Sequence, residues 1–186
     1  MASTSADDPR QVAIRRWADI PHKERLRSEI DAIFFEASGT KSFASEAERA
    51  AFRERWLGRY LVREPEWAYL AIASDKSVAG YLVGSIDASG HQADSGYLQG
   101  FAPLPADYPA HLHVNLAPAF RNRGIGRDLI AAFAADAYRA GAKGLHVVTA
   151  AGARNVGFYE RAGFCVLARS KVGERELVFL GRKLGP

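Results

Sequence analysis

Cysteine is almost absent from this chain, since Cys165 is the single one. One thiol cannot form an internal disulfide, and it cannot supply the several thiolates of a structural zinc site. The sequence therefore excludes a disulfide-stapled scaffold and a cysteine-based zinc fold, and we expect no bound metal. This cysteine usage is what a reducing cytoplasm favours.

Long apolar runs are also lacking. No stretch approaches the roughly eighteen apolar residues of a membrane span. The opening MASTSADDPR has neither the cationic start nor the apolar centre of a signal peptide. We therefore expect no membrane association and a cytoplasmic location. Residues 1–9 are small and polar, and we expect a disordered tail there.

Charge of one sign is not concentrated anywhere. The formal net charge is +4, but no block of lysine and arginine and no basic patch with interleaved aromatics stands out, so we do not expect nucleic-acid binding. The 48% hydrophobic and 25% charged content is typical of a globular protein. At this length the chain is one domain by the usual prior, which we place at residues 10–186.

Hydrophobic periodicity predicts alternating strands and helices. The ranges expected to be helical are 20–36, 46–60, 125–138 and 153–161. Asp19 is the expected N-cap of the first helix, and Ser45 with Glu48 matches a capping box at the second. The ranges expected to be strands are 11–17, 67–73, 78–87, 111–116, 145–150, 164–170 and 176–184.

The connections between these elements suggest a mixed α+β class. Residues 74–77 and Gly173 mark hairpin turns, which indicates antiparallel pairing. A strand–helix–strand unit should place residues 145–150 parallel to residues 111–116. Residues 88–109 show no sustained period, so we expect a long loop there that is mobile or functional.

The most informative stretch, residues 111–138, reads as a strand, a basic turn and an amphipathic helix closed by Gly141. The turn holds three arginines around two glycines. Unpaired backbone N–H groups at a helix start bind anions, and arginines beside them favour phosphate. We call residues 121–127 the diphosphate cradle. It is not a Walker A loop, and Leu129 stands where a dinucleotide fingerprint needs its third glycine.

The cradle resembles the Arg/Gln-x-x-Gly-x-Gly/Ala loop of the GNAT superfamily of acyl-CoA N-acyltransferases. A second block, NVGFYERAGF at residues 155–164, is similar to the N-x-x-x-F-Y-E-x-x-G-F segment of the same family. The resemblance covers residues 67–182. It implies a central, mostly antiparallel twisted sheet with one splayed parallel strand pair, flanked by about four helices. It also implies acetyl-CoA as co-substrate and transfer of the acetyl group to an amine through a tetrahedral intermediate.

The resemblance also assigns the residues that hold the cofactor and protonate the thiolate. Those assigned to acetyl-CoA are Leu116, Ala117, Arg121, Asn122, Arg123, Gly124, Ile125, Gly126, Arg127, Asn155, Phe158 and Tyr159. Leu116 and Ala117 would pair with the pantetheine arm. Tyr159 is the expected general acid, because a phenol is protonated at neutral pH and can donate to a thiolate. Alternatively, Tyr159 is a packing aromatic and Asn155 an N-cap.

The general base is less well defined by the sequence. The central strand carries no carboxylate, and its His111 and His113 resemble the paired histidines of arylalkylamine N-acetyltransferases. A neutral imidazole can accept a proton at pH 7. The spacing to the cradle is one residue shorter than in those enzymes, so either a bulge absorbs the difference or the rings lie elsewhere. The alternative is a half-buried, hydrogen-bonded histidine pair; Asp94, Asp107 and Tyr108 are the remaining candidates.

A finer resemblance links YPAHLHVNLAP and residues 155–164 to the acetyltransferase-like domain of O-GlcNAcases and its free-standing bacterial relatives. Some of those domains are not active acetyltransferases, and relatives often carry Asp where Asn115 stands. Three functions follow, in order. They are an N-acetyltransferase acting on a small amine or a lysine, an inactive acyl-CoA-binding or protein-interaction module, and a nucleotide-phosphate binder of another fold. We expect acetyl-CoA and an unidentified amine as partners, and a monomer or homodimer.

Overall fold

The computed structural model describes residues 12–87 and 96–185. The tail predicted at residues 1–9 and the candidate Asp94 lie outside the described residues. The chain divides into two compact units, which are described separately. The first unit is Met1–Val83 with Val114–Ala132, and the second is Gly84–His113 with Phe133–Pro186. The prediction that residues 10–186 form a single domain stays a prediction.

The strands belong to one seven-stranded sheet in the order β1-β2-β3-β4-β5-β7-β6. Their bounds are β1 Val12–Arg16, β2 Ala68–Ala73, β3 Val78–Ser85, β4 Ala110–Leu116, β5 Gly144–Ala150, β6 Cys165–Val172 and β7 Arg175–Lys183. The pairs β1–β2, β2–β3, β5–β7 and β6–β7 are antiparallel. β4 and β5 are parallel. The predicted class, a mostly antiparallel sheet with one parallel pair, is confirmed.

The helices are more numerous than the four expected. In the described ranges they are α1 Glu24–Ala37, α2 Glu46–Arg53, α3 Arg59–Arg63, α5 Leu104–Asp107, α6 Ile125–Arg139 and α7 Val156–Arg161. The second predicted helix is interrupted by a π-helical segment, Glu54–Gly58. A Cβ on Gly58 would meet only the ends of the Glu54 and Arg53 side chains, which are flexible and can move aside. The helix predicted over residues 46–60 is present; it contains this π-helical turn and continues to Arg63.

Residues 96–107 also differ from the prediction of a loop. They form a 3₁₀ helix, Gly96–Phe101, followed by α5. Leu98 and Phe101 are buried there and pack with Phe179. These helices are only six and four residues long. That is too short to show a hydrophobic period, so periodicity could not identify them.

The first helix begins later than predicted. Its N-cap is Lys23, and Asp19 lies four residues before it in a turn closed by the Asp19 N–H to the Arg16 carbonyl at 3.2 Å. His22 has φ +51°, in the left-handed region, which a right-handed helix cannot include. The helix can therefore start only after His22. The capping prediction at Ser45 is confirmed, because its Oγ accepts from the Glu48 N–H at 3.1 Å.

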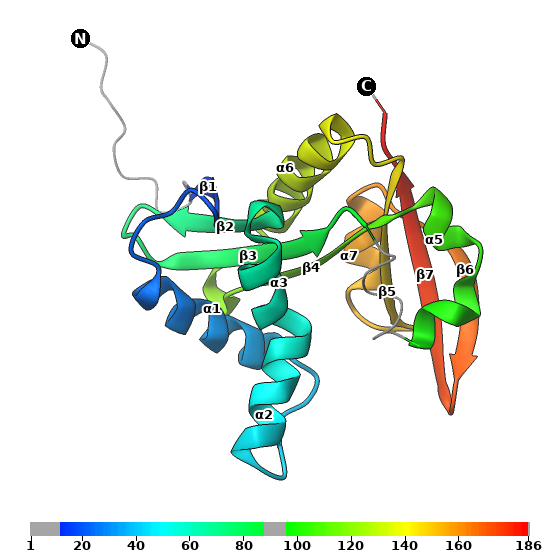
Figure 1. Cartoon of the computed structure of the whole chain (residues 1–186), viewed down its shortest axis with the longest axis horizontal. Helices are drawn as coiled ribbons and strands as arrows, with labels where there is room; N and C mark the ends of the chain where they lie inside the picture. Colours follow the sequence, from blue (N-terminus) through cyan, green and yellow to red (C-terminus); the bar gives the residue numbers. More distant parts are fainter. Residues whose placement is uncertain (1–11, 88–95, 186) are drawn as a thin grey trace. The chain divides into compact units, whose positions relative to one another are not determined.

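In the first unit, β1, β2 and β3 lie side by side and α1 runs beside β3 (Figure 1). Ile30 and Phe34 of α1 pack with Leu57 in one buried cluster. Trp17 belongs to this cluster, and its indole N–H donates to the Leu61 carbonyl at 3.1 Å. A buried aromatic with a satisfied polar atom is a strong anchor for the unit.

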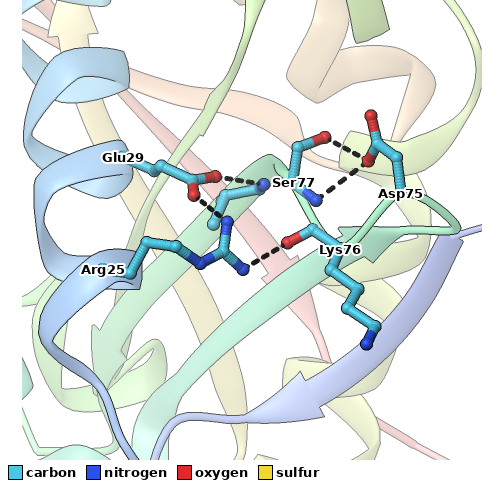
Figure 2. A network of polar contacts seen from close by, with 6 residues as sticks. Arg25, Glu29, Asp75, Lys76 and Ser77 are labelled. Atoms are coloured by element: carbon cyan, nitrogen blue, oxygen red, sulfur yellow. Dashed lines mark hydrogen bonds and ion pairs between the residues drawn. The ribbon is translucent and has the colours of Figure 1, made fainter.

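A polar network ties α1 to the β2–β3 hairpin turn (Figure 2). Arg25 forms an ion pair with Glu29 and donates to the Lys76 carbonyl at 2.8 Å. The Glu29 carboxylate accepts the Val78 N–H at 2.7 Å. Ser77 donates its N–H to the Asp75 carboxylate at 2.9 Å, which closes the turn. The hairpin predicted at residues 74–77 is confirmed.

In the second unit, β5, β7 and β6 lie side by side (Figure 1). The β6–β7 hairpin turns at Gly173, with φ +60°, as predicted. Phe101, Tyr108 and Phe179 form a buried cluster in this unit. α7 ends at Arg161, and Gly163 follows with φ +88°, the stop predicted from the sequence.

The strand–turn–helix at the centre of the sequence is present. The stripe predicted on α6 is buried throughout: Ile125, Leu129, Ile130, Phe133, Ala134 and Ala137. Gly141 has φ +90°, and the Ala142 N–H donates to the Ala137 carbonyl at 2.9 Å, which is the left-handed C-cap expected from the sequence.

Candidate functional site

The diphosphate cradle is built mainly by backbone conformation. Asn122 and Gly124 have φ of +61° and +84°. A Cβ placed on Gly124 would have no heavy atom within 4 Å, so the space in front of this residue is open. The Asp128 N–H donates to the Gly124 carbonyl at 3.1 Å and so begins α6. An anion can approach the backbone here, at the positive end of a helix.

The cradle residues differ in exposure. Ile125 and Gly126 are buried and anchor the cradle. Gly124 and the three arginines are exposed. Arg123 lies over the Phe120 ring, with 5.5 Å from the guanidinium carbon to the ring centroid. Arg127 is exposed on the first turn of α6. Arg123 and Arg127 are therefore the two cradle cations that a phosphate in solvent can reach most directly.

Arg121 is held differently from the other two arginines. Its Nε donates to the Leu116 carbonyl at 3.1 Å, and its Nη2 pairs with the carboxylate of Glu36. Glu36 lies in the last turn of α1, which the sequence did not connect with the cradle. Both partners lie in the same unit as Arg121.

Leu116 and Ala117, predicted to pair with pantetheine, are not equivalent. The Ala117 N–H donates to the Ala79 carbonyl at 3.0 Å, and its own carbonyl accepts the Phe120 N–H at 2.9 Å. Successive residues of a strand direct their backbone groups to opposite edges. The backbone of Leu116 therefore points away from β3. Its carbonyl already accepts the Arg121 Nε, so the Leu116 N–H is the group of this pair that faces an added strand-like ligand.

Three histidine rings form a cluster in the second unit. The rings of His111 and His113 have centroids 6.2 Å apart, and those of His111 and His146 are 5.6 Å apart. His146 faces His111 because the two are register partners in the parallel pair β4–β5. The sequence suggested His111 and His113 but missed His146. The predicted parallel pairing of residues 111–116 with 145–150 could have identified His146, but the sequence did not give the register between the two strands.

His146 is buried and neutral. It is 3% exposed, and its ring stacks on Phe179 with centroids 4.9 Å apart and an interplanar angle of 15°. Its Nδ1 lies 2.6 Å from the Tyr108 carbonyl, so Nδ1 carries the proton and donates it. Burial lowers the pKa of His146 to about 4, against the smaller raising effect of that hydrogen bond.

Asn115 is occupied by a structural contact. Its amide Nδ2 donates to the Tyr81 hydroxyl at 2.8 Å. Tyr81 is buried, and burial raises the pKa of its phenol well above the ordinary value. Asn115 therefore satisfies a buried hydroxyl, a role that an amide performs and a charged carboxylate at the same place would perform at a desolvation cost.

Tyr159 lies in the interior of the second unit. It is 6% exposed, and its ring meets those of Phe158 and Phe164 at 5.1 and 5.6 Å between centroids. Burial raises the pKa of the Tyr159 phenol well above its ordinary value, so the group stays protonated at neutral pH. The Tyr159 N–H donates to the Asn155 carbonyl at 3.0 Å, which places the two residues one turn apart.

Asn155 is exposed and occupies the N-cap position of α7 without a side-chain cap bond. Its Oδ1 instead accepts from the Thr149 hydroxyl at 3.0 Å, which ties α7 to the end of β5. Of the other base candidates, Asp107 is exposed at the end of α5. Tyr108 is buried, and its ring packs edge-on against Phe179 at 6.2 Å.

A cavity of about 370 Å³ lies in the first unit, between the end of α1 and the start of α2. It is lined by Phe35, Thr40, Lys41, Phe43, Ser45, Glu46 and Arg49. The Arg49 guanidinium stacks over the Phe35 ring at 3.7 Å. The lining combines aromatic faces with charges of both signs, in the region where the first two predicted helices meet.

The candidate residues divide between the two units. The cradle, Leu116, Ala117, Asn115 and Glu36 belong to the first, and the three histidines, Asn155, Phe158 and Tyr159 belong to the second. Within the described ranges, 12–87 and 96–185, no group of three or more His, Cys, Asp or Glu side chains is arranged to hold a metal. The helices of those same ranges include none that is long and apolar enough to cross a membrane.

The comparison with protein families agrees with this strand–cradle–helix arrangement. The model of the Acetyltransferase (GNAT) family matches residues 24–164. This chain belongs to the GNAT family. The match includes β4, the cradle, α6, β5 and α7, so it contains both sequence blocks that carried the resemblance.

Solved structures share the GNAT fold with this chain. SsHAT is 22% identical with a TM-score of 0.72, over 95% of this chain and 100% of its own. A putative acetyltransferase of the GNAT family from Desulfovibrio desulfuricans is 22% identical with a TM-score of 0.62, over 94% and 100%. A chain of the NatC complex bound to Gag peptide and CoA is 14% identical with a TM-score of 0.63, over 94% and 99%. At these identities the likeness is one of fold.

Proposed function

We propose that this GNAT-family chain is an N-acetyltransferase that moves the acetyl group of acetyl-CoA to an amine, on a small molecule or on a lysine side chain. The observation that carries the proposal is the diphosphate cradle. Left-handed Asn122 and Gly124 turn the chain into α6, the space before Gly124 is open, and Arg123 and Arg127 are exposed beside it.

The cradle fits the diphosphate of a CoA thioester. Backbone N–H groups in the first turn of α6 have no carbonyl partner within their own helix, and they favour an anion. Gly124 lets the phosphate oxygens approach the main chain, since a Cβ would occupy that space. Arg123 and Arg127 supply charge-assisted donors. The CoA bound to the NatC complex supports the same class of ligand for this fold.

The acetyl thioester supplies an electrophilic carbonyl and a thiolate leaving group. The amine nitrogen attacks that carbonyl, a C–N bond forms, and the C–S bond breaks from a tetrahedral intermediate. Tyr159 gives its phenolic proton to the departing sulfur. Its burial keeps the phenol protonated until then, and the desolvation that raises the pKa of the phenol also raises that of a nearby thiol.

The proton lost by the amine passes to His111 or His113, directly or through water. The two rings lie on one side of β4, since residues two apart on a strand share a face. His146 remains neutral beside them, so it adds no positive charge that would oppose protonation of His111. Asn115 takes no part in this transfer, because its amide is bound to Tyr81.

One observation favours a second function, an acyl-CoA-binding or protein-interaction module without catalysis. Asn115 stands where the domains related to O-GlcNAcases often carry aspartate, and here it satisfies the Tyr81 hydroxyl. A position devoted to packing would be expected after loss of a catalytic group. The proposal also includes a relationship to the acetyltransferase-like domain of O-GlcNAcases, a cytoplasmic location, and a monomeric or homodimeric state.

Release of CoA thiol from acetyl-CoA separates the two functions. The protein is incubated with acetyl-CoA alone and with a panel of primary amines, including lysine peptides, and thiol is followed by its colour reaction. Amine-dependent release at a rate above that of the heated protein supports the transferase. Acetyl-CoA binding by calorimetry, with no release for any amine, would favour the binding module. If acetyl-CoA does not bind, the transferase and the acyl-CoA-binding module both fail, and only the protein-interaction module is left.

A further inference from the structure

Arg121 opens the cradle motif, yet its side chain is engaged with the protein. Its Nε donates to the Leu116 carbonyl at 3.1 Å, and its Nη2 pairs with the Glu36 carboxylate. Leu116 ends β4 and Glu36 lies in the last turn of α1. The guanidinium thus joins the end of a strand, the start of the cradle and the end of a helix, all within one unit.

Glu36 occupies a position where a carboxylate is unfavourable. The C-terminal end of a helix carries a partial negative charge that repels it, and α1 has no basic residue in its last turn. Two cations from outside the helix compensate. Lys41 donates its Nζ to the carbonyls of Glu36 and Phe35 at 2.5 and 3.4 Å, and Arg121 pairs with the carboxylate itself.

α1 is the rigid partner of this contact. Ile30, Ile33 and Phe34 fix it in the buried cluster of the unit. The cradle before α6, in contrast, is a stretch of exposed residues from Arg121 to Gly124. The ion pair between Glu36 and Arg121 therefore fixes the exposed turn relative to the packed helix α1. The charge of Arg121 is balanced by Glu36, so Arg123 and Arg127 provide the net positive charge of the cradle.

We propose that Glu36 is a positioning residue of the diphosphate cradle, and that Arg121 acts as a strut between Glu36 and Leu116 rather than as a phosphate ligand. This assignment rests on the proposed acyl-CoA function. The strut role and the alternative role of Arg121 as a phosphate ligand predict opposite changes in acetyl-CoA affinity when the Glu36 charge is removed. If Arg121 bound phosphate, removing the Glu36 charge would free the guanidinium and tighten acetyl-CoA binding. If Arg121 is a strut, the same change loosens the cradle and weakens binding.

The test is a double-mutant cycle on acetyl-CoA affinity, measured by calorimetry for Glu36→Gln, Arg121→Gln and the pair. We expect each single variant to bind about two- to fivefold more weakly, as the loss of a partly exposed ion pair predicts, and the double variant to be no weaker than either. KM for acetyl-CoA should rise with kcat unchanged, because positioning of the diphosphate does not touch the reacting atoms.

Two control variants separate positioning from general destabilisation and from phosphate binding. Asp31→Asn removes another α1 carboxylate that is paired with an arginine, Arg53 at 2.8 Å, and should lower stability without changing acetyl-CoA affinity. Arg123→Gln should both weaken binding and reduce its dependence on salt, since it removes a charge that faces the phosphate. Arg121→Gln should leave the salt dependence as it is in the wild type.

Two results would overturn the strut. One is tighter or unchanged acetyl-CoA binding by Glu36→Gln together with a reduced salt dependence in Arg121→Gln. The other is unchanged amide hydrogen exchange at residues 117–124 in both variants, a measurement that needs no ligand. If the wild-type protein does not bind acetyl-CoA, the proposed function fails, and faster exchange at residues 117–124 in both variants would still support the strut.

Discussion

The diphosphate cradle and the histidine cluster are held in place by different physical means. The cradle is exposed, and backbone dihedrals at Asn122 and Gly124 give it its form. His111 and His146 are buried and depend on packing between β4, β5 and Phe179. An exposed anion site works through charge that salt can screen. A buried cluster works through desolvation, which shifts protonation and which salt barely affects.

The comparison predicts which perturbations each region tolerates. The cradle should respond to changes in backbone freedom and ionic strength, and the buried region to changes in hydroxyl groups, ring nitrogens and pH. Four experiments test this division. They are ordered from the largest expected effect to the smallest.

Tyr159→Phe should lower kcat by about 10²–10⁴, the usual range for a positioned general acid. The ring and its contacts with Phe158 and Phe164 remain, so the melting temperature and acetyl-CoA affinity should barely change. Steady-state kinetics with the best amine acceptor provide the measurement. Tyr81→Phe is the matched control, because it removes the hydroxyl of another buried tyrosine. Equal kcat for both variants and the wild type would make Tyr159 a packing residue and weaken the contrast.

Gly124→Val should weaken acetyl-CoA binding by about 10²-fold or more, as expected when two charge-assisted hydrogen bonds to phosphate are lost. The side chain would fill the space that the phosphate needs, at a residue with φ +84°. Gly126→Val should act in the same direction. Gly141→Val is the matched control, since Gly141 has φ +90° and equally open surroundings but ends α6. It should lose similar stability while binding acetyl-CoA normally. Equal affinities in all three variants would remove the cradle assignment.

The double variant His111→Gln/His113→Gln should lower kcat/KM by about tenfold to hundredfold, because water can replace a missing base only in part. In the wild type, kcat/KM should fall as the pH drops through about 6–7, where an ordinary histidine protonates. The double variant should lose that dependence and still bind acetyl-CoA. A wild-type pH profile in the double variant would transfer the base role to Asp107 or to solvent.

His146 should make the free energy of unfolding depend on pH. Its folded pKa of about 4 lies below the value of about 6.5 expected when unfolded. The unfolded state therefore binds the proton first, and stability is complete above pH 6.5 and decreases as the pH falls toward 4. The loss should be on the order of 3 kcal/mol. Urea unfolding at several pH values measures it. His146→Gln should be less stable at pH 7 and should show a flatter pH dependence; an equal slope would assign the loss to other groups.

The two regions also differ in how far the sequence could predict them. Periodicity and hairpin turns were sufficient for the seven strands and the parallel pair, because these patterns are local. The cradle could also be predicted from a local pattern, because its glycines and arginines lie within seven residues. The start of α1 was misplaced because no sequence pattern marks the left-handed backbone of His22, and none marks the π-helical turn at Glu54–Gly58.

Contacts between side chains far apart in the sequence could not be predicted. His146 joins the cluster only through its register with His111. Asn115 finds Tyr81 thirty-four residues away, and Glu36 meets Arg121 eighty-five residues away. No local pattern marks such a pair, because either side chain alone is typical of an exposed or half-buried position. Whether Asn155 and Tyr159 act on the cofactor stays a prediction from the resemblance.

The network between α1 and the β2–β3 turn has a consequence for protein engineering. The Glu29 carboxylate accepts the N–H of Val78, the first residue of β3, and Arg25 donates to the Lys76 carbonyl. These hydrogen bonds attach the tip of the β2–β3 hairpin to α1 (Figure 2). Peptide tags or new chain termini inserted at this turn would break these hydrogen bonds to α1. The β6–β7 turn at residues 172–175 is exposed throughout and reverses at Gly173. Insertions and circular permutation are best accepted at such a tip, which makes it the preferred point for a reporter or a surface tether.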